Sequence, residues 1–185
     1  PVHIEDHIAR PPIAVSAAAV SALAERATVP TYDRTALRPS IVHIGVGGFH
    51  RAHLATYINE LCASGHTAWA IVGAGLLPSD AKRATALGHQ DHLYTLVARD
   101  ERHTAVEVIG SIIDFVLASD DSSLLVERIA DERTQILSMT ITEGGYPVDD
   151  ATGSFVAAKS EPDSVFAVVA RGLDVRRRRN GAPIT

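Results

Sequence analysis

The sequence has 185 residues, of which 46% are hydrophobic and 21% are charged, and its formal net charge is −5. These values are typical of one soluble globular domain, and the acidic balance argues against a nucleic-acid-binding surface. No apolar stretch reaches the about 18 residues of a membrane helix, no secretory signal is visible, and Cys62 is the only cysteine, which predicts a cytoplasmic protein without disulfides.

The first part of the chain predicts a strand–helix–strand unit behind a short lead-in. Residues 1–39 are expected to be the lead-in, broken by prolines and containing one Ala-rich helical stretch at 16–27. The β-branched run Ser40–Ile44 is typical of a buried parallel strand and ends at a glycine turn. A helix is predicted over Ala52–Ser64 and a second strand over Ala68–Val72. This order forms a βαβ unit with a right-handed connection.

The rest of the chain is predicted to continue the alternation. The expected elements are a helix at 79–87, strands at 92–99 and 105–109 joined by a polar turn, a strand or connecting segment at 112–116, a helix at 122–130, a strand at 134–141 and a helix at 164–179. The pattern predicts an α/β fold, namely a Rossmann-like, doubly wound, mostly parallel sheet formed by residues 40–185. The four arginines at 176–179 are either a basic patch or, as we favour, a solvated helix end that complements the helix dipole.

The segment between the first strand and the first helix has the clearest chemical meaning. Its residues are Gly45, Val46, Gly47, Gly48, Phe49, His50 and Arg51. One glycine permits a tight turn, the next lets the backbone approach a pyrophosphate, and N–H groups at the helix start hold the anion. The common fingerprint has a third glycine where His50 stands, so the match is partial. Its place between a strand and a helix favours a dinucleotide-binding site over a structural turn.

Other side chains of the predicted crevice have two interpretations each. Asp80 is the first acid after the second strand, so it either accepts hydrogen bonds from the adenosine ribose, favouring NAD over NADP, or caps a helix. Arg51 either steers phosphates or faces solvent, and His50 either donates to a phosphate or packs under the helix. Thr142 and Glu143 follow the strand expected beside the crevice, and Glu143 alternatively sits at a structural turn. The histidines show no metal spacing, so no zinc site is expected.

Four segments of the sequence resemble the polyol-specific long-chain dehydrogenases. They are Ile44–His53, Trp69–Gly75, Gln90–Leu96 and Thr140–Tyr146, and they follow the order in which that family has them. Four matches in order are far more specific than a glycine turn. The sequence is therefore identified as a member of this family.

The resemblance implies that this part of the chain binds a cofactor and that a second domain carries the catalytic base. By resemblance, the turn from Gly45 to Arg51 binds the NAD pyrophosphate, Asp80 is the acid that favours NAD, and Thr142 and Glu143 lie near the nicotinamide. The family oxidises a secondary alcohol of an open-chain polyol to a ketose by hydride transfer, without zinc. A lysine of a C-terminal helical domain is its general base, supported by an asparagine and a histidine.

By the same resemblance, we expect that substrate domain to lie outside this sequence. Lys82 and Lys159 are the only lysines and lie in no matching motif, so no catalytic residue is assigned and this chain alone is expected to be inactive. Pro183–Thr185 lead towards a further strand. We expect the exposed sheet edge to self-associate or to receive the missing domain.

One short stretch of the sequence favours one of the activities found in the family. Leu93–Leu96 favours members that interconvert mannitol and fructose, and the fructuronate and tagaturonate reductases are the alternative. A third interpretation, from another class, is a non-catalytic nucleotide-binding module or one subunit of a split enzyme.

Overall fold

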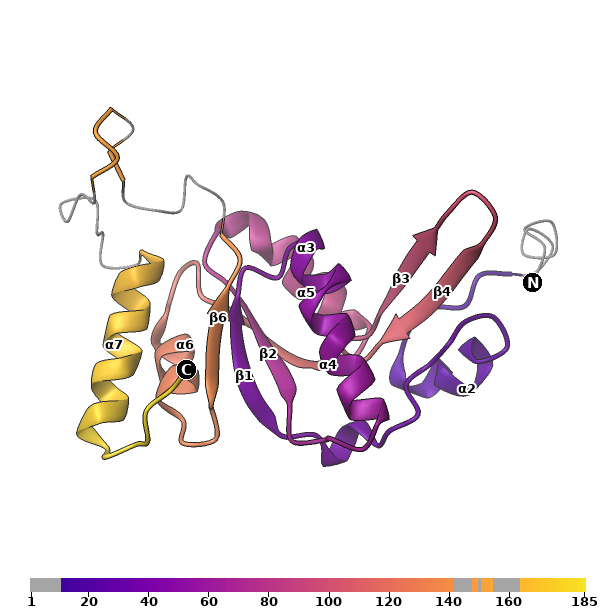
Figure 1. Ribbon diagram of the computed structural model, residues 1–185, viewed down its shortest axis with the longest axis horizontal. Coiled ribbons are helices and arrows are strands. Elements are labelled where there is room, and N and C mark those ends of the chain that lie inside the picture. Colours follow the sequence, from indigo (N-terminus) through magenta and orange to yellow (C-terminus); the bar gives the residue numbers. More distant parts are fainter. Residues whose placement is uncertain (1–10, 142–147, 150, 155–163) are drawn as a thin grey trace.

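Four parallel strands form the central sheet of the computed structural model, which describes residues 11–141, 148–149, 151–154 and 164–185. The strands are β1 (Pro39–Ile44), β2 (Ala70–Gly75), β5 (Ile112–Leu117) and β6 (Ile136–Met139), and they lie in the order β5-β2-β1-β6. The chain moves outward from β1 to β5 and then returns to place β6 on the other side of β1 (Figure 1). This reversal is the switch point of a doubly wound sheet, so the predicted architecture is confirmed.

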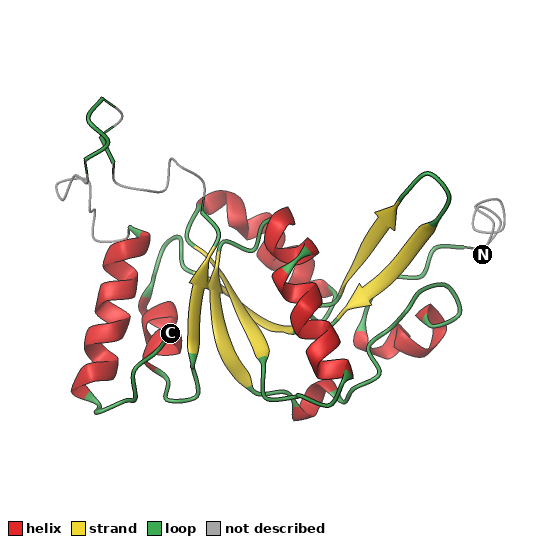
Figure 2. Cartoon of the chain, in the orientation of Figure 1, coloured by secondary structure: helices red, strands yellow, loops and turns green. Residues whose placement is uncertain are grey.

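Helices cover both faces of this sheet (Figure 2). The helices of the described ranges are α2 (Val20–Leu23), α3 (Gly48–Ala52), α4 (Leu54–Ala63), α5 (Ala81–His89), α6 (Ser123–Ala130) and α7 (Val165–Arg178), with 3-10 turns η1 (Ala17–Ala19), η2 (Arg34–Ala36) and η3 (Pro78–Asp80). Side chains of α4 and α5 pack on one face, and those of α6 and α7 pack on the other. No helix in the described ranges is long and apolar enough to cross a membrane.

Residues of β1 alternate between two separate core layers. Ile41 packs with α4 and α5, whereas Val42 and Ile44 pack with α6 and α7. Each of these side chains is buried, as expected for a strand whose two faces are both covered. His43 points to the same face as Ile41 because side chains two residues apart share a face. The strand therefore carries one polar side chain into an otherwise apolar layer.

The first crossover helix differs from the prediction at its start. The helix was expected to begin at Ala52, but α3 begins at Gly48, directly after the glycine turn, and α4 follows after a break at His53. The backbone of His53 has φ −122° and ψ −83°, which is not helical. The Ala-rich stretch of the lead-in forms only η1 and α2, because that segment packs few of its residues into a core. The early helix start brings backbone N–H groups to the glycine turn.

The β3–β4 hairpin stands apart from the central sheet. Strands β3 (Tyr94–Arg99) and β4 (Thr104–Ile109) pair in antiparallel register across the predicted polar turn, and Figure 1 shows them projecting from the body of the molecule. The lead-in packs against this hairpin: Leu23 is buried with Leu93 and Val108, and Thr28 forms a bridge with Glu107. The segment between β2 and β5 is thus anchored by the start of the chain.

The basic run at the end of α7 is a set of paired side chains. Arg177 and Arg178 both contact Asp174, and Arg179 pairs with Glu127 of α6 at 2.9 Å. These three exposed side chains agree with the favoured interpretation of a solvated helix end. Arg176 does not, because it is buried and only 4% exposed.

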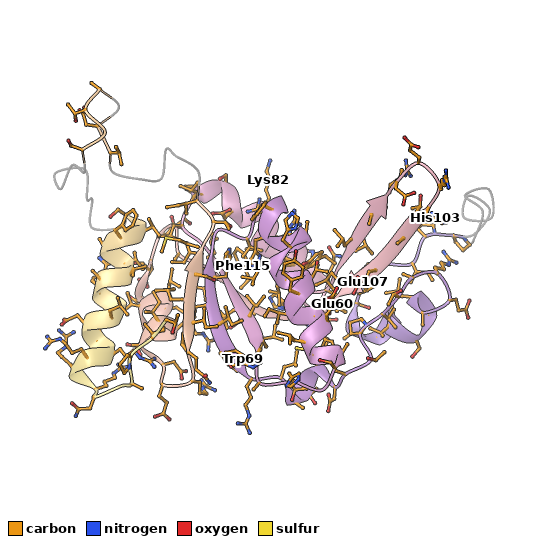
Figure 3. All side chains as sticks on the ribbon, in the orientation of Figure 1. Glu60, Trp69, Lys82, His103, Glu107 and Phe115 are labelled. Carbon is orange, nitrogen blue, oxygen red and sulfur yellow. The ribbon has the colours of Figure 1, made fainter. Side chains whose placement is uncertain are left out.

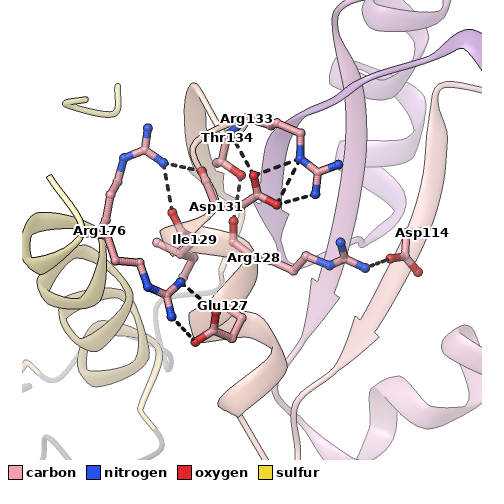
Figure 4. Close-up of polar contacts among 9 residues, drawn as sticks. Asp114, Glu127, Arg128, Ile129, Asp131, Arg133, Thr134 and Arg176 are labelled. Carbon is pink, nitrogen blue, oxygen red and sulfur yellow. Dashed lines mark hydrogen bonds and ion pairs between the residues drawn. The ribbon is translucent and has the colours of Figure 1, made fainter. Parts of the chain in front are cut away.

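Arg176 is expected to stabilise the contact between α6 and α7. Its guanidinium donates to the carbonyls of Ile129 and Asp131 at the end of α6 (Figure 4). It also donates to the Ala182 carbonyl at 2.6 Å. Replacing it in Arg176→Met leaves these carbonyls without a donor, and we expect the free energy of unfolding to fall by about 3 kcal/mol. Urea denaturation measures this change. The matched control Arg177→Met removes an exposed pair and should cost less than about 1 kcal/mol; equal losses in the two variants would contradict the assignment.

The outer edge of β6 is occupied by the last residue of the chain. Thr185 donates its N–H to the Gln135 carbonyl at 3.1 Å and accepts from the Leu137 N–H at 2.8 Å. This pattern, in which one residue bonds two residues that flank a third, is that of a parallel ladder. The chain therefore reaches the sheet again after α7, as the approach of Pro183–Thr185 to a further strand predicted.

Candidate functional site

The glycine turn lies where β1 and β6 end side by side, at the switch point of the sheet. Gly45 follows β1 with a φ of +92°, a conformation that side chains disfavour. A Cβ on Gly45 would lie 2.2 Å from the carbonyl oxygen of Thr140, which follows β6. The N–H of Gly45 donates to the Ala74 carbonyl of β2 at 2.9 Å. The fold itself therefore requires glycine at this position.

The next two glycines are not required by the protein's own packing. A Cβ on Gly47 would have Gly45 O as its nearest described neighbour, at 4.0 Å, and a Cβ on Gly48 would meet no described atom within 4 Å. Gly47 has φ −79° and ψ −173°, which any residue adopts. Bare backbone on an open surface is the cradle that a phosphate group needs. The two positions are therefore free for a ligand to approach closely.

The start of α3 presents unpaired donors at this open surface. Gly47 is the N-cap, and its carbonyl accepts from the Arg51 N–H at 3.1 Å. Within the described ranges, the N–H groups of Gly48, Phe49 and His50 donate to no protein acceptor. Unpaired N–H groups at a helix start attract an anion. The turn thus combines free donors with the absence of side chains that would shield them.

The side chain of Val46 anchors the turn from below. It is buried, and a Cβ on Gly73 of β2 would lie only 2.7 Å from its Cγ2 atom. Val46 therefore packs over a glycine of the neighbouring strand, and only its backbone can meet a ligand.

His43 and His50 stack beneath the turn. Their ring centroids are 3.7 Å apart with an interplanar angle of 14°, and both side chains are almost fully buried. Burial lowers the pKa of His43 to about 4, partly offset by the Gly45 backbone. Burial, together with the nearby His43 and Arg51, lowers the pKa of His50 to about 3. Both rings are therefore neutral near pH 7.

The stacked rings explain how α3 packs on β1 without the third glycine of the common fingerprint. That glycine permits close approach of helix and strand. Here two flat rings fill the space in parallel planes. Neither ring nitrogen of His50 has a hydrogen-bond partner in the described part of the chain, so His50 serves this contact through its surface and shape. His50 accordingly lies under the turn and does not reach a phosphate through its side chain.

Arg51 and Tyr94 support the turn from the side. The Tyr94 hydroxyl donates to the Arg51 carbonyl at 2.7 Å, and the Arg51 guanidinium lies 5.8 Å from the centre of the Tyr94 ring. Arg51 Nε also donates to the Gly47 carbonyl at 3.4 Å. Burial raises the pKa of the Tyr94 hydroxyl, so it remains a donor. Arg51 is therefore folded back on the turn, with its positive charge beside the free N–H groups.

Asp80 lies against the end of the neighbouring strand. A Cβ on Gly75, the last residue of β2, would be 2.7 Å from the Asp80 Oδ2 atom. Asp80 also accepts from the Leu77 N–H at 3.2 Å and pairs with Arg83 at 2.6 Å. The carboxylate thus caps the local turn, as one of the two interpretations predicted, and it does so at the carboxyl end of β2.

Comparison with known proteins decides the family. Residues 39–185 match the mannitol dehydrogenase Rossmann domain. The chain belongs to this family. It is 41% identical over 170 residues to the mannitol 2-dehydrogenase of Cereibacter sphaeroides, which covers 85% of this chain and 35% of that protein. It is 47% identical over 140 residues to the Emericella nidulans mannitol 2-dehydrogenase, covering 75% of this chain and 28% of the relative.

Solved structures show the same fold. The ternary complex of Pseudomonas fluorescens mannitol 2-dehydrogenase with NAD and D-mannitol matches with a TM-score of 0.85 and 37% identity, over 92% of this chain and 37% of that chain. A D-sorbitol dehydrogenase in substrate-free form matches with a TM-score of 0.85 and 32% identity, over 93% and 38%. The chain spans about a third of the length of its curated relatives. It is the Rossmann domain of a polyol dehydrogenase family, as the four segments predicted.

The predicted site residues of this Rossmann domain fall into three groups. The turn from Gly45 to Arg51 forms one surface at the end of β1, and Asp80 lies at the end of the adjacent β2. Thr142 and Glu143 lie outside the described residues. Of the two lysines, Lys82 is exposed on α5 (Figure 3), and Lys159 is also outside the described residues.

Sequence reasoning missed the polar partners beneath the turn. His43 bonds Ser138 at 2.8 Å and Thr140 at 3.0 Å, and the Thr140 hydroxyl donates to the Gly45 carbonyl at 2.7 Å. The available signal was a histidine within a β-branched run, together with polar residues two apart in the strand expected beside it. Arg83, the partner of Asp80, was missed as well. Within the described ranges, no three His, Cys, Asp or Glu side chains gather as a metal site.

Proposed function

We propose that this chain is the NAD-binding part of an oxidoreductase that interconverts mannitol and fructose. The observation that carries the proposal is the bare surface of Gly47 and Gly48 beside unpaired N–H groups at the switch point of the sheet. A relative of the same fold binds NAD and D-mannitol together. Ligands of open α/β sheets bind in this crevice.

The residues present fit a dinucleotide. The turn from Gly45 to Arg51 would hold the pyrophosphate through backbone N–H groups, with the Arg51 charge beside it. Asp80, at the end of β2, would accept hydrogen bonds from the adenosine ribose hydroxyls. Thr142 and Glu143 follow β6 in sequence and would lie near the nicotinamide. The nicotinamide, when bound, accepts a hydride from the carbinol carbon of the polyol.

The chain's own contribution to the reaction is binding and orientation. Backbone donors of the turn and the Asp80 carboxylate would hold the two ends of the adenosine diphosphate part and so would orient the rest of the cofactor. The proton of the alcohol must leave through a base, and no residue of this chain is assigned that task. The remaining part of the enzyme would supply it, together with the second wall of the crevice.

A second polyol is a candidate substrate. The D-sorbitol dehydrogenase matches this chain with the same TM-score of 0.85 as the mannitol enzyme. Sorbitol and mannitol differ at one carbon, and the groups that distinguish them would lie in the substrate domain that the resemblance implies. The fructuronate and tagaturonate reductases remain the alternative drawn from sequence.

Calorimetric titration of the chain with NAD and with NADP tests the proposal, followed by a mannitol oxidation assay on the same sample. We expect weak NAD binding, because one wall of the crevice buries little of the ligand, and no turnover. Turnover by this chain would show that the catalytic groups are misassigned. Failure of both nucleotides to bind would contradict the proposal for the isolated domain.

Asp80 is expected to determine the preference for NAD. The carboxylate repels a 2′-phosphate, and in Asp80→Ser that repulsion is lost while Arg83 loses its partner and can contact the phosphate. We expect NAD affinity to fall about tenfold and NADP affinity to rise by a similar factor. Paired titrations with the two nucleotides measure the change. Lys82→Ser, an exposed substitution in the first turn of α5, should alter neither affinity. A retained preference for NAD in Asp80→Ser would exclude Asp80 from the ribose site.

A further inference from the structure

We propose that His43, held between Ser138 and Thr140, sets the position of the Gly45 carbonyl and so holds the glycine turn in its phosphate-binding form. The inference deepens the proposed function and rests on it, since it assigns positioning residues to the same turn. His43 is buried beneath the turn, and Ser138 and Thr140 are half-buried beside it. They act on the ligand only through the backbone of Gly45.

The direction of each hydrogen bond follows from counting protons. The Gly45 carbonyl can only accept a hydrogen bond, so the Thr140 hydroxyl must donate its one proton in that bond of 2.7 Å. The Thr140 oxygen must then accept from His43 Nε2, 3.0 Å away. A neutral imidazole with its proton on Nε2 has a lone pair on Nδ1, which accepts from the Ser138 hydroxyl at 2.8 Å. The chain of bonds therefore selects one tautomer of His43.

This chain of bonds crosses between two strands. His43 is on β1 and is paired in register with Ser138 on β6, and Thr140 follows β6. The bonds therefore run from the edge of the β1–β6 pair to the first peptide of the turn. Strand pairing fixes both ends, because the Thr140 N–H also donates to the Ile44 carbonyl at 2.9 Å. The Thr140 hydroxyl is thus held at a fixed place relative to Gly45.

The Gly45 carbonyl accepts hydrogen bonds from two donors, and these two bonds fix its orientation. It accepts from the Thr140 hydroxyl on the β6 side and from the Gly47 N–H at 2.7 Å within the turn. With both bonds made, the carbonyl faces the protein. A peptide that rotated away would turn the negative end of its dipole towards the pyrophosphate and would move Gly47 off the start of α3. The hydroxyl of Thr140 opposes this rotation.

His50 shields the bonds from water. Its ring stacks on His43 at 3.7 Å, and both side chains are buried, with exposed fractions of 0% and 1%. Hydrogen bonds in such a dry layer are stronger than in water, and a partner left unpaired there is costly. The stack therefore explains why a polar cluster persists in the layer between β1 and α3.

The test compares three threonine variants of the full chain. Thr140→Val removes the hydroxyl with little change of shape, Thr140→Ser keeps it, and Thr134→Val is the matched control. Thr134 lies near the other end of β6 and donates to the Arg128 carbonyl at 2.7 Å, far from the turn in sequence. It is buried, whereas Thr140 is half-buried, so the control removes the more deeply buried hydroxyl. NAD affinity by calorimetry and thermal unfolding are measured for each. A purely structural role would lower stability in both valine variants without separating their affinities.

We expect the variants to differ in NAD affinity in a way that their thermal stabilities do not explain. Thr140→Val should weaken NAD binding about tenfold, whereas Thr140→Ser and Thr134→Val should stay within about twofold of the wild type. Wild-type affinity in Thr140→Val, with the wild type binding NAD, overturns the positioning by Thr140 and leaves the proposed function intact.

A measurement without nucleotide separates this inference from the proposed function. Backbone amide spectra of Gly47 and Gly48 should shift in Thr140→Val and not in Thr134→Val, and ¹⁵N shifts of His43 should show the proton on Nε2. Unchanged glycine amides in Thr140→Val overturn the inference, as does a proton on Nδ1. Absence of NAD binding in the wild type overturns the proposed function, and the amide spectra then decide the inference alone.

Discussion

Replacing Gly47 by valine is expected to abolish NAD binding while leaving the fold almost unchanged. The backbone at Gly47 adopts φ −79° and ψ −173°, which valine tolerates, and the nearest described atom to an added Cβ is 4.0 Å away. Valine would instead occupy the space into which the pyrophosphate must come. We expect at least a hundredfold loss of affinity with a change in stability below about 1 kcal/mol. Calorimetric titration and urea denaturation of the variant measure the two quantities.

The matched control is the neighbouring glycine that the fold requires. Gly45→Ala combines a φ of +92° with a Cβ placed 2.2 Å from the Thr140 carbonyl oxygen, so the turn must shift. We expect this smaller substitution to lower the free energy of unfolding by about 3 kcal/mol. Unchanged NAD affinity in Gly47→Val would refute the assignment of the turn to the pyrophosphate.

Acidification is expected to destabilise the protein before its carboxylates are protonated. The pKa values of His43 and His50 are lowered to about 4 and about 3 in the folded state, against an unfolded value near 6.5. Below pH 6.5 these histidines therefore bind protons in the unfolded chain but not in the folded chain. The free energy of unfolding consequently falls as the pH falls. The combined loss between pH 6.5 and 4.5 should be on the order of 4 kcal/mol. Urea denaturation at several pH values measures it.

Two variants check that the stacked rings cause this dependence. His50→Phe keeps a flat ring over His43 but removes one proton site, so the slope of stability against pH should fall to about half. His66→Gln changes an exposed histidine after α4 and should leave the slope unchanged. A flat profile for the wild type between pH 6.5 and 4.5 would show that the two rings are not buried as neutral groups.

The strands of the central sheet were predictable from local patterns, whereas the start of α3 was not. Runs such as Ser40–Ile44 carry their own signal, because a strand covered on both faces is apolar almost throughout. In α3 the buried position is His50, and an imidazole is not counted as part of an apolar stripe. The predicted helix therefore began only at Ala52, where apolar spacing resumes.

The polar cluster beneath the turn could not be predicted for a different reason. The partners of His43 are 95 and 97 residues away in sequence, so their meeting depends on which strand lies beside β1. The prediction placed the strand containing Ser138 and Thr140 beside the crevice, and in the structure that strand pairs with β1. It did not extend to hydrogen bonds, because register decides them: a shift by one residue would turn Ser138 to the opposite face. The glycine turn around Gly47 was easier to predict than this cluster, because its residues are close together in the sequence.

The span between β1 and β6 bears on the order of events during folding. β1 and β2 are joined by one short helical crossover and can pair early, whereas β6 must close a loop of 95 residues to reach His43. Until β6 docks, the His43 ring has neither hydrogen-bond partner and the Gly45 carbonyl lacks the donor from Thr140. An intermediate that already contains β1, α4 and β2 would hence have a loose turn. We expect the turn to take its final form late, when β6 pairs with β1.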